Sequence, residues 1–577
     1  MNISGSGDSE SRPVPRGLDI EAARRQTFQH SVNTGEVGRL LEGRLTMPPH
    51  AEWQLPHEPT WTEDPFQDRN WCFQFHTLRW LEPIRRAAAK GDAAALSMWL
   101  HYTEDWTTKN PRRNPASTWA WVDMADGLRA QQLCLGIPLV SEHAPEQLPW
   151  LENSIRDHAE HLADPKHVGK ANHALHQAES LFVCGRVLGA ESHWELAARR
   201  MSSLLKEQYD EQGMNAEGAT AYHYNNFLWW ERALRRFDAE GLPRPDGAER
   251  HLNAPEQIAH ATKPDGYLVS IGDTDTQSPQ KIAHQHTDYT TSNGTRGAAP
   301  EQAVAIYDAG YVFARSGWGD DDRPYSEQTY FTLRFGPSRR VHGHQDGTSI
   351  TYSSSGVNWL VDPGKYEYGS STPRLHVISR AAHNVVTVEG RRLLKDSDVE
   401  LLRRDITPRH HDYVLADPSF DRVSLTRRVI HSVRGEYLVV IDEISGPRRL
   451  TAEQRWQLGP EVEAEAVNRS VALSSGNQHA MLWFDGESAD VRTVRAQDDP
   501  FDGYVSVGWK KLAPATAVIV RKKGARLRFL TVVATGGESQ PAVERVQTVS
   551  RDDVGLLVTT SHGTEQITIS PDDVVFP

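Results

Sequence analysis

Cysteine is scarce in this chain of 577 residues. Its three cysteines, Cys72, Cys134 and Cys184, are odd in number and widely spaced in helical-looking segments. This pattern predicts reduced core residues rather than disulfide bridges, as expected in a reducing compartment. Long apolar runs are also missing, and a membrane-spanning helix needs about 18 or more consecutive apolar residues. A transmembrane helix is therefore excluded by length, and we expect no membrane partner.

The N-terminal stretch MNISGSGDSESRPVPR has no apolar core of the kind found in secretory signals. We therefore expect a cytoplasmic protein, with secretion by a non-standard route left open. Positive charge is in deficit as well, since 63 Lys and Arg residues face 77 Asp and Glu residues, a net charge of −14. This balance argues against nucleic acid as a partner. A local basic cleft could still bind an anionic sugar polymer, and residues 334–340 are the best candidate for it.

The hydrophobic pattern changes partway along the chain. Between about residues 70 and 261, apolar residues recur every three or four positions and predict at least seven helices joined by short loops. Later segments alternate and are rich in β-branched residues, which predicts antiparallel strands. The sequence thus indicates a multidomain α+β protein. Its predicted parts are a loosely held polar leader (1–45), a helical domain (46–283), a linker (284–300) and an antiparallel β-sandwich (301–577).

Three short motifs in the β half contain groups suited to metal binding or acid/base chemistry. They are VHGHQDG at 341–347, VDPG at 361–364 and AAHN at 381–384. If the first is a strand, His342 and His344 point to the same face. His344, Asp362 and His383 would suit a divalent metal of the zinc type, which leaves His342 free for chemistry. With 26 histidines in the chain, an ordinary structural pair is the alternative.

These motifs, taken in order with DAGY at 308–311 and RSGW at 315–318, resemble the heparinase II/III-like polysaccharide lyases over roughly residues 70–577. The helical half adds two matches, Asn172-His173 and Tyr222-His223. The resemblance implies an N-terminal α/α-toroid, an incomplete barrel, followed by a C-terminal antiparallel β-sandwich. It also implies a lyase that acts on a uronic-acid-containing glycan.

The resemblance implies catalytic roles for four residues. Asn172 would engage the uronate carboxylate, with His173 as an adjacent acid/base or carboxylate contact. Tyr222 would be the proton donor or shuttle, and His342 would lie near the reaction centre. Asn172 could alternatively be only the N-cap of its helix, and Gln177 stands where the family commonly has Glu.

The metal set implied by the resemblance is again His344, Asp362 and His383. We expect a structural divalent metal, zinc by its ligands, that ties these segments together and fixes where His342 points. A direct Lewis-acid role is the alternative.

Several further residues are predicted to contact the substrate. An Arg fork suits a carboxylate or sulfate, and aromatic faces stack on sugar rings. The predicted contacts are Tyr366, Tyr368, Arg374, Arg340, Trp119 and His223. Arg339 and Arg380 are further candidates beside Arg374 and Arg340, and we expect only one of the four to bind the ligand.

A uronate lyase neutralises the C6 carboxylate, removes the C5 proton and protonates the departing O4 oxygen. Amide and imidazole donors suit the first task, and Tyr and His suit the other two. The predicted function is therefore β-elimination on an anionic polysaccharide or oligosaccharide. Two alternatives stay open: a toroid-type glycoside hydrolase, for which Glu179 and Glu217 are available, and a non-catalytic glycan-binding protein. The polymer, endo or exo action, syn or anti elimination and a homo-oligomer are all undecided.

Overall fold

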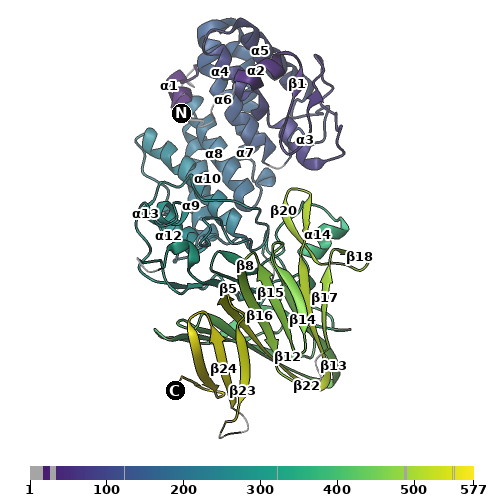
Figure 1. Ribbon diagram of the computed structural model, residues 1–577. Coiled ribbons are helices and arrows are strands. Elements are labelled where there is room, and N and C mark those ends of the chain that lie inside the picture. The colour runs from purple at the N-terminus through teal and green to yellow at the C-terminus, as the bar shows by residue number, and fades with distance from the viewer. Residues whose placement is uncertain are drawn as a thin grey trace, which may run out of the picture. The chain divides into compact units, whose positions relative to one another are not determined.

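The computed structural model describes most of the chain and divides into two compact units (Figure 1). The first unit comprises Met1–Glu207 and Trp229–Glu249, and the second comprises Gln208–Leu228 and Arg250–Pro577. The described residues are 17–25, 34–122, 124–320, 323–338, 340–486, 490–548, 550 and 553–576.

The first unit is helical, apart from a short pair of strands, β1 (Arg44–Leu45) and β2 (Trp53–Gln54). Its helix α10 begins in the second unit. The helices are α1 (Ile20–Arg24), α2 (Thr34–Leu41), α3 (Arg69–His76), α4 (Glu82–Ala88), α5 (Ala93–Lys109), α6 (Ala125–His143), α7 (Leu148–Ala163), α8 (Ala171–Val187), α9 (Glu191–Gln208) and α10 (Thr220–Ala239).

Helices α6 and α8 form the centre of this unit. Nearly all of their residues are buried, and both contact α7 and each other. The predicted core position of the cysteines is confirmed: Cys134 of α6 and Cys184 of α8 are buried, with their sulfur atoms 3.8 Å apart. A Cβ at Gly136 would lie 2.1 Å from the Trp99 ring, so glycine at this position lets the indole of α5 reach α6.

The seven predicted helices are all present, but one helix start and the description of the leader need correction. Apolar spacing over residues 117–136 predicts a helix that starts at residue 117, whereas α6 begins only at Ala125. The described part of the predicted leader is also folded rather than loosely held. Ala22 and Ala23 of α1 are buried, and α1 contacts α6 and α8.

The second unit is built mainly from antiparallel strands. Its described residues also include four short α-helices: α11 (Ala248–His251, which starts in the first unit), α12 (Ala254–His260), α13 (Gln285–Thr291) and α14 (Thr372–Val377). Helix α13 lies in the predicted linker 284–300, contacts α12 and buries Thr287 and Thr290.

Within the described part of this unit, the strands form three sheets of four or more strands and two short hairpins. The five-stranded sheet contains β3 (Val304–Tyr307), β4 (Tyr311–Arg315), β5 (Tyr330–Arg334), β7 (Ile350–Ser354) and β8 (Val357–Leu360). The eleven-stranded sheet contains β6 (Gly336–Pro337), β9 (Val386–Val388), β10 (Asp398–Ile406), β11 (His410–Ala416), β12 (Ser424–Ser432), β13 (Tyr437–Gln457), β14 (Glu463–Val467), β15 (Ser470–Ser475), β16 (Gln478–Phe484), β17 (Asp490–Arg495) and β22 (Thr516–Gly537). The remaining strands are β18 (Gln497–Asp498), β19 (Phe501–Asp502), β20 (Tyr504–Gly508), β21 (Lys511–Pro514), β23 (Ala542–Val546), β24 (Val554–Thr560), β25 (Gly563–Ile569) and β26 (Val574–Val575).

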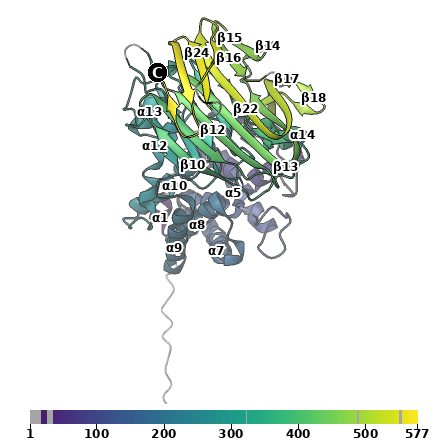
Figure 2. The ribbon, with the colours of Figure 1, turned by 90° about the horizontal axis from the view of Figure 1, so that it is seen from below.

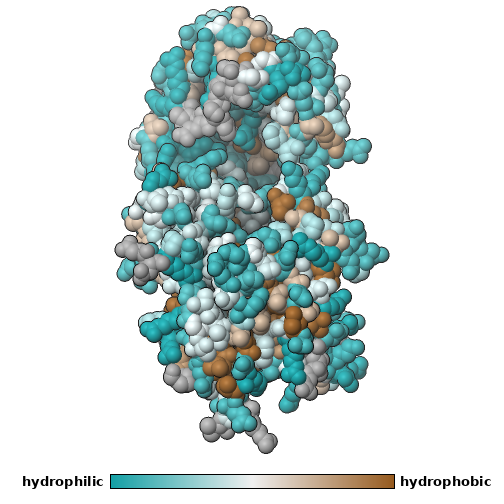
Figure 3. Space-filling view, viewed as in Figure 1, coloured by the Kyte–Doolittle hydropathy of each residue, from teal (hydrophilic) through white to brown (hydrophobic). Residues whose placement is uncertain are grey.

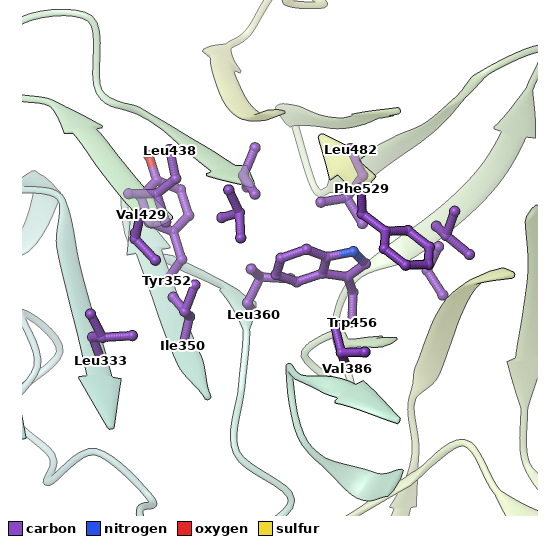
Figure 4. Close-up of a cluster of buried hydrophobic side chains, with 14 of the residues drawn as sticks. Leu333, Ile350, Tyr352, Leu360, Val386, Val429, Leu438, Trp456, Leu482 and Phe529 are labelled. Atoms are coloured by element: carbon purple, nitrogen blue, oxygen red, sulfur yellow. The ribbon is translucent and has the colours of Figure 1, made fainter. Parts of the chain in front are cut away.

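The central strands of the large sheet are buried on both faces, whereas β10, β14 and β17 are largely exposed. Figure 2 shows β12, β13 and β22 side by side within it. One face packs on the five-stranded sheet through the core drawn in Figure 4, where Ile350 and Tyr352 meet Val429 and Leu438. The other face packs on the four-stranded sheet β23–β26 through residues such as Val439. Apolar residues therefore follow one another without alternation in the central strands.

The predicted antiparallel β half is confirmed. Among the described residues, no helix is both long enough and apolar enough to cross a membrane. On the face drawn in Figure 3, hydrophilic residues predominate and hydrophobic residues form small groups.

Candidate active site

Three loops of the second unit meet backbone to backbone around His342. The amide of Gly218 donates a hydrogen bond to the carbonyl of Val341 at 2.8 Å, and the amide of Asp273 donates to the carbonyl of His342 at 2.9 Å. A Cβ on Gly218 would lie 2.6 Å from the Cα of Gly343, so the approach requires glycine. This close packing fixes the three loops relative to one another.

His342 and His344 lie in a loop, and the strand predicted for this segment is wrong. β6 ends at Pro337, β7 begins at Ile350, and His342 has a φ of +60°, in the left-handed region. The two imidazoles nevertheless reach one carboxylate, that of Asp273. The loop conformation, not strand alternation, brings them together.

Asp273 is the centre of this arrangement. Its oxygens lie 3.0 Å from Nδ1 of His342 and 3.1 Å from Nε2 of His344, and it also accepts hydrogen bonds from Arg374. Burial alone would raise the pKa of Asp273, but these hydrogen bonds hold it well below its usual range. Because an ionised carboxylate only accepts, Nδ1 of His342 and Nε2 of His344 are assigned as the protonated nitrogens.

Tyr222, in the first turn of α10, lies against His342. The two rings are stacked, with centroids 3.6 Å apart and planes 8° apart, and the Tyr222 hydroxyl is hydrogen-bonded to that of Tyr368. On the other side of the imidazole, a Glu217 oxygen lies 3.7 Å from Nε2 of His342. Burial raises the pKa of the Tyr222 phenol, and its acidic neighbours raise it further. The phenol therefore keeps its proton at neutral pH.

Tyr368 is the more exposed partner, with 38% of its surface accessible. The Lys365 ammonium lies 4.4 Å from the centroid of its ring and 5.3 Å from that of Trp509. The Tyr368 and Trp509 rings themselves meet edge to face. The backbone amide of Tyr366 is bound to the β20–β21 hairpin by a 2.9 Å hydrogen bond. Of the two predicted tyrosines, Tyr368 is the one whose hydroxyl reaches Tyr222.

His344, Asp362 and His383 form a buried group that could hold a metal ion, with ligand atoms all within 4.8 Å of one another. Nδ1 of His344 lies 3.3 Å from Nε2 of His383, and the nearest Asp362 oxygens lie 3.9 and 3.5 Å from these two nitrogens. Nδ1 of His383 donates to the carbonyl of Ser379 at 2.7 Å, and Nε2 of His344 faces Asp273. The two facing nitrogens therefore both present lone pairs.

Spacing and charge in this group suit a divalent cation. Ligand atoms around a tetrahedral zinc, each about 2.0–2.1 Å from the metal, lie roughly 3.3 Å apart, close to the separations found. Burial, with His344 nearby, lowers the pKa of His383 to about 3, which keeps the imidazole in its neutral, metal-binding form. Burial and the neighbouring Asp346 raise the pKa of Asp362, so a cation would stabilise its ionised form.

Asn172 and His173 stand in the first turn of α8, in the first unit. The N-cap of this helix is Lys170, so Asn172 is not the N-cap. Gln177 accepts a 2.7 Å hydrogen bond from the amide of Gly169 and so holds the loop before the helix. The catalytic roles of Asn172 and His173 stay predictions.

Two predicted substrate contacts lie in very different surroundings. His223 is only 2% exposed, and its Nδ1 accepts a hydrogen bond from the amide of Asn215 at 3.3 Å. Burial lowers its pKa to about 3. This buried imidazole supports the loop before α10, and a substrate contact for it is not supported. Trp119, in the first unit, is half-buried in a turn before α6, and its contact with substrate stays a prediction.

The predicted arginines are mostly committed to contacts inside the second unit. Arg374 donates to Asp273 and to the carbonyl of Lys365, and Arg380 is bound to Asp417 and other buried groups. Arg340 is half-buried and lines a cavity of about 790 Å³ beside β10. Arg339 lies outside the described residues.

Sequence reasoning missed Asp273 and Trp509 and did not connect Glu217 with His342. Asp273 follows the apolar run Tyr267–Ile271 and a glycine, a pattern that marks a polar residue at the end of a buried segment. Trp509 is half-buried at the tip of a short hairpin, and loop residues of this kind often bind ligands. Neither signal indicates which partner the residue contacts.

The chain matches two family descriptions, "Heparinase II/III N-terminus" over residues 45–244 and "Heparinase II/III-like, C-terminal" over residues 298–552. The structure of heparinase III has a TM-score of 0.77 at 16% identity, covering 98% of this chain and 94% of that one. The heparan sulfate lyase HepC of Pedobacter heparinus has a TM-score of 0.71 at 17% identity, covering 96% and 92%. The comparison with curated proteins gives no match.

Both halves of the chain thus match the same family, and the solved structures share its fold over nearly their whole length. The predicted α/α-toroid followed by an antiparallel β-sandwich is confirmed. The chain belongs to the heparinase II/III-like family of polysaccharide lyases.

Proposed function

We propose that this protein cleaves a uronic-acid-containing glycan by β-elimination, with Tyr222 and His342 transferring the protons. The observation that supports this most is the stacked pair itself: a protonated phenol lies against an imidazole whose Nδ1 is bound by Asp273. A proton donor and a proton acceptor within reach of one sugar are what the reaction needs.

The stacking indicates from which side of the substrate Tyr222 and His342 would transfer protons. Rings 3.6 Å apart are in van der Waals contact and leave no room for a sugar between them. Tyr222 and His342 would therefore act from the same side of the substrate, which favours syn elimination. In this scheme Nε2 of His342 removes the C5 proton, the C5–H electrons form the C4–C5 double bond, and the C4–O4 bond breaks. The Tyr222 phenol then protonates the departing oxygen.

The C6 carboxylate must be neutralised for the C5 proton to become acidic, and hydrogen-bond donors aimed at that group serve this purpose. Asn172 and His173 are the proposed donors, as the family resemblance implies. Lys365, which lies over the Tyr368 and Trp509 rings, would add positive charge on the sugar-binding side. Tyr368 and Trp509 would present aromatic faces to the polymer.

For the substrate, we propose a glycosaminoglycan of the heparan type. The solved structures that share the fold include proteins named heparinase III and heparan sulfate lyase. Hyaluronan-type, alginate-type and bacterial exopolysaccharide uronates form the comparison panel.

The metal held by His344, Asp362 and His383 is proposed to be zinc, with a structural role. When bound, it would neutralise the buried Asp362 carboxylate and join three loops. Asp273, which contacts both His344 and His342, would pass that rigidity on to the imidazole that faces the substrate.

A glycoside hydrolase would need two carboxyl groups flanking the scissile bond. Glu179 is bound to Arg232, and Glu217 accepts a 3.1 Å hydrogen bond from Asn226, so both acids are engaged in structural contacts. The products separate the two functions. Elimination yields a conjugated, ultraviolet-absorbing end group on a panel of uronate polymers, whereas new reducing ends without absorbance would indicate hydrolysis.

A further inference from the structure

A bend in the two longest strands creates an unusual surface on the second unit. Strands β13 and β22 pair with each other along most of their length, with a register shift between Ser445 and Leu450. Before the shift β13 pairs with β12, and after it with β9. The strands thus pass from one set of neighbours to another, a corner of the kind that bulges make in β-sandwiches. Figure 2 shows the two strands as long neighbours.

The corner encloses a groove of about 630 Å³. Six of its eight lining residues are basic and one is acidic, in a chain whose net charge is −14. We name this groove the basic corner; it is lined by Arg449, Asp490, Arg521, Lys522, Lys523, Arg526, Leu527 and Arg528.

Three of these cations maintain the shape of the corner. Lys522 donates to the carbonyls of Asp485 and Arg528 at 3.2 and 2.8 Å. Arg521 is paired with Glu389, and Arg528 lies 3.6 Å from Glu443. These contacts keep the strands in register around the bend.

The other three cations point outward. Arg449, Lys523 and Arg526 are exposed, and within the described part of the chain no side-chain hydrogen bond or ion pair is found for them. Like charges close together on adjacent strands repel one another and destabilise the sheet. A cluster of unneutralised cations at a fixed bend is therefore favourable when an anionic ligand supplies the opposite charge.

We propose that the basic corner is a second glycan-binding site, which holds an anionic stretch of a sulfated uronate polysaccharide and shares no lining residue with the stacked Tyr222–His342 pair. Arg forks bind sulfate and carboxylate groups bidentately, and Lys adds a point charge. A basic cluster of this density is a recognised pattern for heparin-like polyanions. The choice of glycan rests on the proposed function, whereas the presence of a polyanion site does not.

The test is a binding measurement that involves no turnover. A fluorescent, size-defined heparin oligosaccharide is titrated into the full chain with Tyr222→Phe, and into the same chain with Arg449→Ala, Lys523→Ala and Arg526→Ala added. We expect about tenfold weaker binding, since exposed charge contacts are individually modest. The slope of log affinity against log salt should also fall by about 2. A matched control removes three exposed cations elsewhere, at Lys90, Arg199 and Lys395, and should bind as the parent does.

A second measurement locates the ligand. On addition of heparin, backbone amides of residues 445–450 and 521–528 should become protected from hydrogen exchange in the parent, and much less in the triple variant. Unchanged affinity in the triple variant, or no protection at the bend, would overturn the proposal. Duplex DNA of equal charge is the comparison ligand. The assignment to a glycan would be overturned if this DNA bound the parent as tightly as heparin does and lost as much affinity in the triple variant. Failure of elimination activity would leave these readings intact, so the two proposals fail separately.

Discussion

Two neighbouring polar clusters of the second unit share Asp273 and differ in exposure. The side chains of His344 and His383 are fully buried. In the stacked pair and its surroundings, the His342 side chain is 18% exposed and Tyr368 is 38% exposed. A polymer can reach the second cluster and not the first. The comparison indicates that the buried cluster serves stability and the exposed cluster serves chemistry, with Asp273 connecting the two.

The largest expected effect comes from removing the phenol that faces the substrate. Tyr222→Phe should lower the rate of unsaturated product formation by about 10²–10⁴, the usual contribution of a positioned proton donor. Thermal stability should change little, because the ring still stacks on His342. The matched control is Tyr224→Phe, a buried tyrosine of the same helix, which should retain activity. Equal activity in the Tyr222 and Tyr224 variants would contradict the assignment.

A substitution in the buried cluster should lower stability, whereas Tyr222→Phe should lower activity. His344→Ala removes a ligand and leaves the Asp362 carboxylate with less compensation, so the free energy of unfolding should fall by about 3 kcal/mol. Denaturant melts with and without a chelator give the measurement. The chelator should destabilise the parent and have little further effect on the variant. A parent that is indifferent to the chelator would argue against a structural metal.

Asp273→Asn tests the connection between the clusters. The amide cannot accept hydrogen bonds from both imidazoles and Arg374 in the way the carboxylate does. Metal affinity and turnover should each fall by about 10–100-fold, as is typical when a residue that orients a metal ligand is replaced. Loss of only one of the two would show that Asp273 serves a single cluster.

The smallest effect is expected at the exposed edge. Tyr368→Phe deletes one hydroxyl–hydroxyl hydrogen bond to Tyr222, worth about 1 kcal/mol, or roughly fivefold in turnover. Trp509→Ala, by contrast, removes an aromatic surface and should raise KM more than it lowers kcat. Steady-state kinetics on one polymer gives kcat and KM for each variant. If Tyr368→Phe and Trp509→Ala changed kcat and KM alike, the separate roles assigned to Tyr368 and Trp509 would be contradicted.

The strands and helices could be predicted from the sequence because burial imposes a period on apolar residues. The runs at 437–446 and 516–536 are strands for that reason. The site depends instead on loops, which have no such period. His342 and His344 were expected together as strand neighbours, and they meet through a loop in which His342 has positive φ.

Contacts between residues far apart in the sequence were the second feature of the site that could not be predicted. Asp273 lies about seventy residues before the histidines it binds, and no local pattern reports that contact. Arg374 illustrates the same limit. Its guanidinium fork suggested a contact with a substrate carboxylate or sulfate, whereas in the structure it is bound to Asp273. The basic corner was also missed, although five of its six cations lie in one run at 521–528; only Arg449 joins them from a distant strand.

The most direct test of the division between the two clusters is to measure metal content and turnover together in His342→Ala. The account predicts that the variant keeps as much bound metal as the parent while its rate of unsaturated product formation falls at least 100-fold. A variant that loses metal in proportion to its activity would contradict it, because His342 would then belong to the buried cluster.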